Sequence, residues 1–332
     1  MIHSTNPIIV VGMHRSGTSL VTRLLEELGV FFGWIQDENA EATFFLKRNE
    51  AILRACGGSW EHPDAVDSLL ASSAMRKRVV RQLRSDLGSL GFISFLGPKR
   101  YVETLRHREA LPAWGWKDPR NSLLLPLWLE LFPAARIIHV VRNGVDVAIS
   151  LCNQARRNLA TDGASTAVHS PPDQANRTRR GCAGGLRLDR LVEWHEYLCK
   201  RFAPLGRYCA AGIPRTLDVH AGLSLWQDYV VRAEEAMRQV DGPTLTIRFE
   251  DLLESPDACI DLMAAFSSMR PSAVIHESCL RLMDPQRAFG FRRLDPGQPL
   301  LRHARQCEVF RRFYPEPASH YMPGVSQCGG AP

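Results

Sequence analysis

The chain has 332 residues, 45% of them hydrophobic and 23% charged, a composition that excludes disorder as its main state and leaves enough apolar mass for a sizeable core. Its 41 Lys and Arg residues against 35 Asp and Glu residues give a net charge of +6. A mild excess of this kind suits an anionic ligand better than duplex nucleic acid, which usually needs a concentrated basic face.

The nine cysteines are odd in number, widely scattered and never arranged as a Cys-x-x-Cys pair, which argues against a disulfide framework or a zinc knuckle. No apolar run approaches the roughly 20 residues that cross a bilayer. The N-terminal run, residues 8–13, is too short for a signal peptide. We therefore expect a cytoplasmic protein without a membrane span.

The first predicted element is a strand over residues 7–12, a continuous run of Pro, Ile, Ile, Val, Val and Gly. A β-branched run without alternation is typical of a strand buried on both faces of a parallel sheet. Leucines at 20, 24, 25 and 28 then recur at helical spacing until Gly29. The segment predicts a central strand, a glycine-containing turn and a helix.

Two later segments repeat the pattern of a strand followed by a helix. Residues 136–141 precede Arg-Asn-Gly and an apolar-spaced helix, and residues 244–249 precede a helix that resumes after Ser255-Pro256, where Ser can cap and Pro suits the first turn. Further helices are expected near 43–56, 66–90, 121–131, 188–202 and 223–239. Strands separated by helices predict an α/β fold of three layers, with a central parallel sheet flanked by helices.

Length permits one or two domains, and we expect a single α/β domain over residues 1–315. Residues 158–186 are small, polar and basic, with almost no periodic apolar content. A long loop of this kind is either a functional lid or a disordered insertion, and both remain open. Residues 316–332 are expected to form a flexible tail.

The segment from Gly12 to Ser19, Gly-Met-His-Arg-Ser-Gly-Thr-Ser, follows the first predicted strand and has the architecture of a phosphate-binding loop. Glycines let the backbone wrap around an anion, and the helix N-terminus supplies positive potential. A Walker A loop has Lys where this chain has Thr18, and its cation lies earlier, at Arg15. The strand over 136–141 is followed by Arg142 and not by a metal-holding Asp, so we expect no metal.

At these residues the chain resembles sulfotransferases that use 3′-phosphoadenosine 5′-phosphosulfate (PAPS) as donor and release the nucleotide PAP. Gly12 to Ser19 resembles their 5′-phosphosulfate loop, and Arg142 to Ser150 resembles their 3′-phosphate motif. Residues 114–120 are similar to a signature of bacterial members, and residues 247–253 to a late strand–helix junction. The resemblance covers roughly residues 7–57, 114–152 and 223–268, and it implies a P-loop-type fold.

The resemblance implies that the donor is held by the loop and by the second motif. A departing sulfuryl group leaves negative charge on the nucleotide, which cations and N–H donors must meet. Arg15 would face the bridging oxygen or the sulfuryl group, and Arg142 would bind a phosphate in bidentate fashion with Ser150 adding a hydroxyl. The alternatives are a solvated turn residue for Arg15 and a surface residue for Arg142. The expected donor-binding residues are Gly12, His14, Arg15, Ser16, Gly17, Thr18, Ser19, Arg142 and Ser150.

A general base must take the proton of the acceptor hydroxyl. Glycan- and tyrosine-modifying relatives use a Glu shortly after the first helix, and the resemblance makes Glu41 the candidate catalytic base, beside Asp37 and Glu38. Small-molecule relatives use a His, which leaves His14 as an alternative. His139 lies within a predicted buried strand and is expected to be a satisfied core residue.

Lys117 and Arg120 are candidates to bind the sulfuryl group or an anionic acceptor. The neighbouring Trp114 and Trp116 are as readily explained by packing. His195 and Cys199, four residues apart on a predicted helix, could suggest a Cys/His nucleophile, but we expect a core-facing pair. Trp226 and Tyr229 lie at helical spacing and are likewise expected to pack in the core. A late basic segment contains Arg287, Arg292 and Arg293, where the family often closes on the nucleotide.

The expected function is transfer of a sulfuryl group from PAPS, without metal, to a hydroxyl or amine of a small-molecule or glycan acceptor. Carbohydrates, lipid-linked glycans, phenols and peptide tyrosines are the candidate acceptor classes; nucleic acid is not. The alternatives are a P-loop kinase and a nucleotide-binding module without catalysis. The sequence does not indicate an oligomeric state.

Overall fold

In a computed structural model of the chain, the structure describes residues 6–107, 113–164, 214–284, 289–295, 297–315 and 325–326. The strands are β1 (Ile8–Gly12), β2 (Gly115–Lys117), β3 (Arg136–Val141), β4 (Thr244–Arg248) and β5 (Val325–Ser326). They form one sheet in the order β2-β1-β3-β4-β5. The first four strands are parallel, and β5 pairs antiparallel with β4.

The helices of the described residues connect these strands and cover both faces of the sheet. The α-helices are α1 (Thr18–Glu27), α2 (Thr43–Ala55), α3 (Ala65–Ala71), α4 (Ser73–Leu87), α5 (Ile93–His107), α6 (Asn121–Leu129), α7 (Gly144–Ala164), α10 (Val219–Met237), α11 (Phe249–Glu254), α12 (Pro256–Ser267), α13 (Ala273–Arg281), α14 (Pro299–Gln306) and α15 (Glu308–Phe313). Short 3₁₀ turns are η1 (Leu90–Phe92), η2 (Arg215–Leu217) and η4 (Gly290–Arg293).

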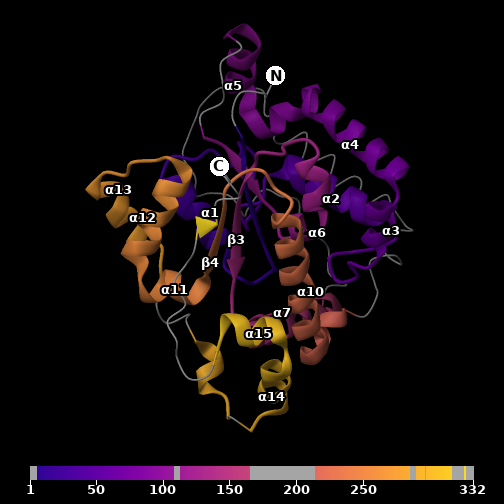
Figure 1. Ribbon diagram of the computed structural model, residues 1–332, viewed down its shortest axis with the longest axis vertical. Coiled ribbons are helices and arrows are strands. Elements are labelled where there is room, and N and C mark those ends of the chain that lie inside the picture. The colour runs from indigo at the N-terminus through magenta and orange to yellow at the C-terminus, as the bar shows by residue number, and fades with distance from the viewer. Residues whose placement is uncertain are drawn as a thin grey trace, which may run out of the picture.

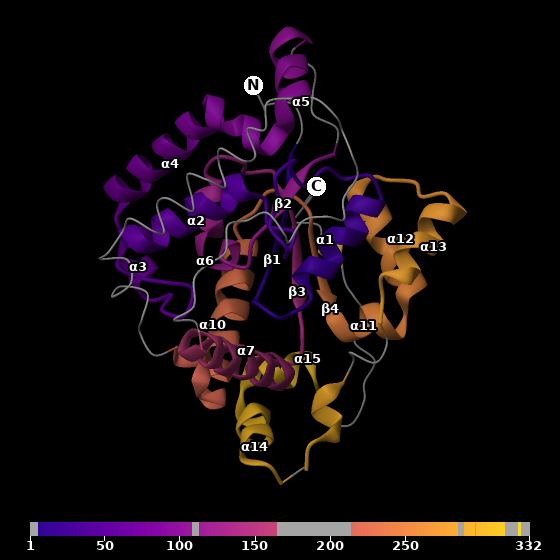
Figure 2. The ribbon, with the colours of Figure 1, turned by 180° about the vertical axis from the view of Figure 1, so that it is seen from behind.

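The molecule has three layers, with the sheet between two groups of helices (Figures 1 and 2). Helices α1, α12 and α13 pack on one face of the sheet, and α2, α6, α7 and α10 pack on the other. The expected α/β fold with a central parallel sheet is therefore confirmed.

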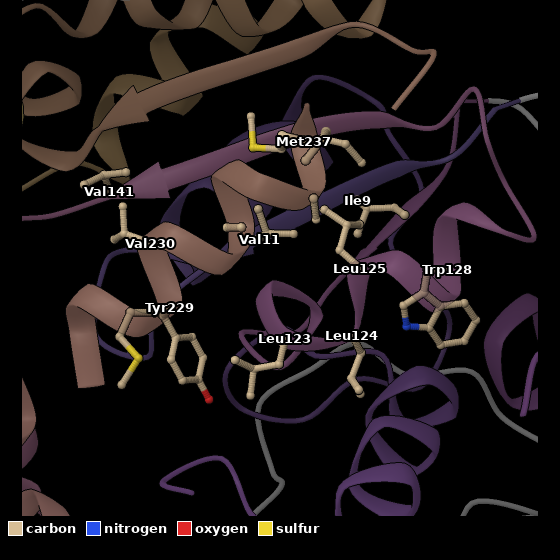
Figure 3. Close-up of a cluster of buried hydrophobic side chains, with 14 of the residues drawn as sticks. Ile9, Val11, Leu123, Leu124, Leu125, Trp128, Val141, Tyr229, Val230 and Met237 are labelled. Carbon is tan, nitrogen blue, oxygen red and sulfur yellow. The ribbon is translucent and has the colours of Figure 1, made fainter. Parts of the chain in front are cut away.

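The two faces of β1 contribute to two separate hydrophobic clusters. Ile8 and Val10 point into the cluster under α1 and α12, whereas Ile9 and Val11 point into the cluster under α6 and α10. Figure 3 shows the second cluster, where Ile9, Val11 and Val141 of the sheet face leucines of α6 and side chains of α10. All five residues of β1 are buried, which explains why the strand lacks polar alternation.

An aromatic cluster joins β2 to α2. The rings of Phe45 and Trp116 are stacked, with centroids 4.0 Å apart and planes 5° apart, and Trp128 packs edge-on against both. Trp114 is fully buried beside them. This cluster packs α2 against β2 and α6, so packing accounts for Trp114 and Trp116. Packing also accounts for the buried Trp226 and Tyr229 of α10.

Several expectations about single segments were wrong in detail. The helix expected over 66–90 is two helices, because Ser72 takes an extended conformation and its hydroxyl accepts a hydrogen bond from the N–H of Met75 to begin α4. Ser255 begins α12 without a side-chain cap. Helix α7 continues through Ala164, so the segment expected as a loop over 158–186 begins in a helix.

Other expectations lie outside the described residues. These are residues 165–186 of the expected lid or insertion, the helix near 188–202 with His195 and Cys199, and most of the tail over 316–332. Two tail residues, 325 and 326, form the edge strand β5. The single domain over 1–315 stays a prediction.

No helix in the described ranges is long and apolar enough to span a membrane. The cysteines that the structure describes, at positions 56, 152, 259, 279 and 307, are all free thiols.

Candidate active site

The loop between β1 and α1 lies at the carboxyl end of the parallel strands. Its path is fixed by backbone bonds, since the N–H of Ser16 donates to the carbonyl of Met13 at 3.1 Å and the N–H of Gly12 donates to the Ser122 hydroxyl at 2.9 Å. Arg15 adopts a left-handed conformation with φ 69°, which is uncommon for a residue with a side chain. The loop thus folds back over the strand that precedes it.

Both glycines of this loop are required by space as well as by conformation. Gly12 has φ 147°, and a Cβ atom there would lie 2.4 Å from the carbonyl oxygen of Val140. Gly17 has φ 92°, and a Cβ atom there would lie 2.2 Å from the ring of Phe249. The loop therefore packs directly against β3 and against the start of α11.

Hydrogen-bond donors of the loop are left without acceptors. Within the described ranges, nothing accepts a hydrogen bond from the backbone N–H groups of residues 17–19 at the start of α1. Ser16 is 1% exposed, and its buried hydroxyl likewise has no partner among the described residues. Orphan N–H groups and a buried hydroxyl at a helix N-terminus match the groups that bind a phosphate or sulfate oxygen.

The second motif meets this loop. The Arg15 Nε donates to the Ser150 hydroxyl at 2.9 Å, across 135 residues of sequence. Arg142, directly after β3, donates from Nη1 to the carbonyl of Arg15 at 3.3 Å, and its guanidinium lies 4.8 Å from the centre of the Phe249 ring. Two arginines and a serine that the sequence places in separate motifs therefore form one cationic corner beside the loop.

Asp146 lies next to this corner. Its carboxylate is 3.7 Å from Arg142 and accepts a hydrogen bond from the N–H of Gly290 at 3.1 Å. Burial raises the pKa of Asp146, while the charge of Arg142 acts in the opposite direction. The late segment around η4 is thus anchored on α7, one turn before Ser150.

Of the late basic segment, Arg292 and Arg293 are not part of this corner in the described structure. Arg292 and Arg293 are exposed, and Arg292 stacks on the ring of Phe289 with its guanidinium carbon 3.5 Å from the centroid. Arg287 lies outside the described residues.

Glu41 is buried in the loop before α2 and is paired with two cations. Lys117 Nζ lies 2.9 Å from Oε1, and Arg120 Nη1 lies 3.5 Å from Oε2. Burial and the neighbouring charge of Asp118 raise the pKa of Glu41 to about 7, although Lys117 acts to lower it. A carboxylate whose pKa lies near neutrality is suited to general-base chemistry.

Lys117 connects this carboxylate to the loop after β1. It is the last residue of β2, is 1% exposed, and also donates from Nζ to the Ser19 hydroxyl at 3.3 Å. The parallel pairing of β2 with β1 places Lys117 opposite Val10, and so sets its side chain beside the first turn of α1. The sequence motifs gave no sign that Lys117 would bridge Glu41 and Ser19.

A polar network behind the site holds the residues that follow β2. The buried Asn49 of α2 donates to Asp118 and to Asn121, both at 2.8 Å, and accepts from the indole of Trp128 at 3.0 Å. Asp118 in turn pairs with Arg120 at 3.1 Å. Arg120, one of the two cations that contact Glu41, is therefore linked through Asp118 to Asn49 of α2.

The other two candidate carboxylates have different surroundings. Asp37 accepts hydrogen bonds from the backbone N–H groups of Asn39 and Glu41, at 3.0 and 2.8 Å, and shapes the loop. Glu38 is exposed. Of the three, only Glu41 contacts Lys117 and Arg120 in the described structure.

The two histidine candidates are also distinct. His14 packs on Trp60 with ring centroids 4.5 Å apart, and burial together with the charges of Arg120, Lys117 and Arg15 holds its pKa well below 6.5. His139 is fully buried in β3 as expected, but the expectation that its ring is satisfied was wrong, because neither nitrogen has a hydrogen-bond partner among the described residues.

The part of the chain that the structure describes contains no group of three or more His, Cys, Asp or Glu side chains that could hold a metal ion. The expected lack of a metal requirement stays a prediction.

A family model described as the sulfotransferase family matches residues 7–185. No curated protein matches the chain.

Several solved structures are similar over most of the chain. The sulfotransferase domain from the olefin synthase of Synechococcus PCC 7002 is 15% identical, with 94% of this chain and 96% of that one covered and a TM-score of 0.47. The sulfotransferase domain from the curacin biosynthetic pathway is 12% identical, with 92% and 95% covered and a TM-score of 0.46. Sulfotransferase STF9 from Mycobacterium avium is 15% identical, with 83% and 67% covered and a TM-score of 0.40. With TM-scores below 0.5, these structures add no argument beyond the family match.

Proposed function

Since this chain belongs to the sulfotransferase family, we propose that it transfers a sulfuryl group from PAPS to a hydroxyl or amine of a small-molecule or glycan acceptor. The observation that carries the proposal is the meeting of the two predicted motifs in one cationic corner. Arg15, Ser150 and Arg142 are joined by hydrogen bonds of 2.9 and 3.3 Å. A nucleotide with phosphates at the 3′ and 5′ positions of its ribose needs two neighbouring phosphate-binding sites.

The residues present fit a donor of this charge. The free N–H groups of residues 17–19 and the buried Ser16 hydroxyl supply donors for the 5′-phosphate. Arg142 with Ser150 supplies a charge-assisted site for the 3′-phosphate. PAPS brings the activated sulfuryl group, and the protein supplies orientation and positive charge.

Arg15 and Lys117 are the cations nearest the reacting end of such a donor. Arg15 extends from the loop, and Lys117 lies against Ser19 at the first turn of α1. Negative charge that develops on the departing phosphate would be stabilised by both side chains. Arg120 is held by Asp118 and Glu50, at 3.1 Å each, and also pairs with Glu41, where it would contact an anionic acceptor.

Glu41 is the proposed general base. It lies 2.9 Å from Lys117, and its pKa of about 7 gives it a substantial ionised fraction at neutral pH together with enough basicity to accept a proton. His14 is the weaker candidate, because its lowered pKa makes it a poor proton acceptor.

Donor recognition is tested by thermal unfolding with PAP. We expect PAP to raise the melting temperature and Arg142→Ala to remove most of that rise, since losing a charged phosphate contact costs roughly 1.5–3 kcal/mol. Arg281→Ala, which removes an exposed arginine of α13, serves as the matched control and should keep the full effect of PAP.

The alternatives give different results in the same assay. A kinase would be stabilised by ATP with Mg²⁺ and not by PAP. A nucleotide-binding module without catalysis would bind PAP but transfer no sulfuryl group to any acceptor. Equal stabilisation of wild type and Arg142→Ala by PAP would contradict the role of Arg142.

A further inference from the structure

Glu250 is a buried carboxylate directly behind the turn that carries Arg142. Strands β3 and β4 pair in parallel with Val141 opposite Arg248, so Arg142 and Phe249 leave the sheet side by side at the same edge. Glu250 follows Phe249 in the first turn of α11 and is 0% exposed. It belongs neither to the donor loop nor to the Glu41 cluster.

Both carboxylate oxygens of Glu250 are occupied by donors from other parts of the chain. Oε1 accepts a hydrogen bond from the backbone N–H of Asn143 at 3.0 Å, and Oε2 accepts from the Tyr314 hydroxyl at 2.7 Å. Asn143 is the residue after Arg142, and Tyr314 follows α15, 64 residues beyond Glu250. Glu250 thus ties the Arg142 turn to the last described helix.

Further contacts hold the turn between β3 and α7 that contains Arg142 and Asn143. The side-chain oxygen of Asn143 accepts a hydrogen bond from the N–H of Val145 at 3.0 Å. The backbone carbonyl of Asn143 accepts one from the N–H of Val147, also at 3.0 Å. Phe249 packs both under the Arg142 guanidinium and against Gly17. With its backbone N–H bound to Glu250, Asn143 leaves Arg142 little freedom to move away from Arg15.

Burying a charged carboxylate costs desolvation free energy unless hydrogen bonds and nearby cations offset it. Burial raises the pKa of Glu250, while the bonds from Asn143 and Tyr314 and the charge of Arg142 act against that rise. The N–H of Asn143 and the hydroxyl of Tyr314 reach different oxygens of Glu250, and a glutamine would place an NH₂ donor against one of them.

We propose that Glu250, held by Tyr314, is a positioning residue that fixes the Arg142 turn and so sets how strongly the 3′-phosphate of the nucleotide is recognised. The proposal rests on the proposed function, because it assigns Arg142 to that phosphate. It gives Tyr314, the residue directly after α15, a part in donor recognition although Tyr314 lies outside the two donor motifs.

The test is a comparison of two nucleotides by calorimetric titration: PAP, and adenosine 5′-monophosphate, which lacks the 3′-phosphate. Wild type should prefer PAP by roughly 10- to 100-fold, the usual effect of charged hydrogen bonds. Glu250→Gln and Tyr314→Phe should each reduce that preference at least about threefold, with adenosine 5′-monophosphate binding unchanged. Glu254→Gln, an exposed carboxylate of the same helix, is the matched control.

A double-mutant cycle separates positioning from general damage. If Glu250 acts through Arg142, Glu250→Gln should add no further loss of PAP affinity in an Arg142→Ala background. Equal loss of affinity for both nucleotides, or full PAP preference in both variants, would overturn the inference. A wild type with no preference for PAP would overturn the proposed donor site as well, and so the two failures are distinguishable.

Discussion

At the scale of single residues, Glu41 combines burial with a close cation. Its surroundings raise its pKa to about 7, whereas Lys117 at 2.9 Å stabilises the ionised form. These opposing effects leave the carboxylate able to change protonation state near neutral pH. A base in such a position can accept the acceptor proton without being permanently protonated.

Glu41→Gln should lower kcat by roughly 10²- to 10⁴-fold while PAP affinity stays close to wild type. The amide keeps the shape of the side chain but cannot take the proton. In the wild type, kcat/KM should rise with pH through about 7 as Glu41 ionises, and this limb should be absent from the residual activity of the variant.

Asp37→Asn and Glu38→Gln are the controls for Glu41, because all three carboxylates lie in one loop. Steady-state kinetics on one acceptor over pH 5.5–9 measures wild type, the three carboxylate variants and His14→Ala. Wild-type turnover in Glu41→Gln would refute the role, and a collapse of activity in His14→Ala with intact PAP binding would move the base to His14.

Resemblance made Glu41 the candidate base, a role that stays a prediction, but the sequence did not predict what surrounds this side chain. Its partners Lys117 and Arg120 lie 76 and 79 residues away, and Arg15 meets Ser150 across 135 residues. Such pairs depend on strand register, since β2 must align with β1 before Lys117 can reach Ser19. No local spacing encodes that alignment.

At the scale of elements, the loop after β1 depends on α11 as well as on its own glycines. Gly17 has no room for a Cβ atom, because Phe249 fills the space that the atom would occupy. The loop and the junction of β4 with α11 are therefore one packed unit, although the chain separates them by more than 200 residues.

Gly17→Ala should lower PAP affinity at least about tenfold and also lower the melting temperature, because the clash with Phe249 adds to backbone strain of roughly 1 kcal/mol. Gly57→Ala is the matched control, since Gly57 has φ 75° but nothing within 4 Å of a Cβ atom. It should show the strain alone, with unchanged PAP affinity. Equal PAP affinities in the two variants would contradict the packing argument.

The elements that the sequence predicted best are those with long apolar runs. Strands β1, β3 and β4 consist largely of Ile, Val, Leu and Thr and were predicted within a residue or two. Strand β2 was missed because it has only three residues, Gly-Trp-Lys, whose strand conformation comes from pairing with β1. The strand conformation of this segment therefore depends on tertiary pairing, which leaves no signal in the local sequence.

At the scale of the whole molecule, His139 links stability to pH. Burial, with a smaller effect from Arg312, lowers its pKa from 6.5 to about 3. The unfolded chain therefore binds a proton at His139 between about pH 6.5 and 3 that the folded chain does not. Stability from this group is complete above pH 6.5 and falls as the pH decreases.

His139→Leu removes this titration. The free energy of unfolding of wild type, relative to the variant, should decrease by about 1 kcal/mol between pH 7.5 and 5.5. Urea unfolding of both proteins at the two pH values measures the change. If the free energies of unfolding of wild type and His139→Leu changed equally between the two pH values, His139 would bind protons equally in the folded and unfolded chains.

The central claim is that the molecule moves a sulfuryl group from PAPS to an acceptor. Its most direct measurement is to incubate the protein with PAPS labelled on the sulfuryl group and an extract of its host, and to identify labelled products by mass spectrometry. The account predicts a labelled acceptor with wild type, much less with Glu41→Gln, and with Arg142→Ala a deficit that higher PAPS concentration partly restores. Label that never leaves PAPS, while the protein transfers phosphate from ATP in the presence of Mg²⁺, would contradict it.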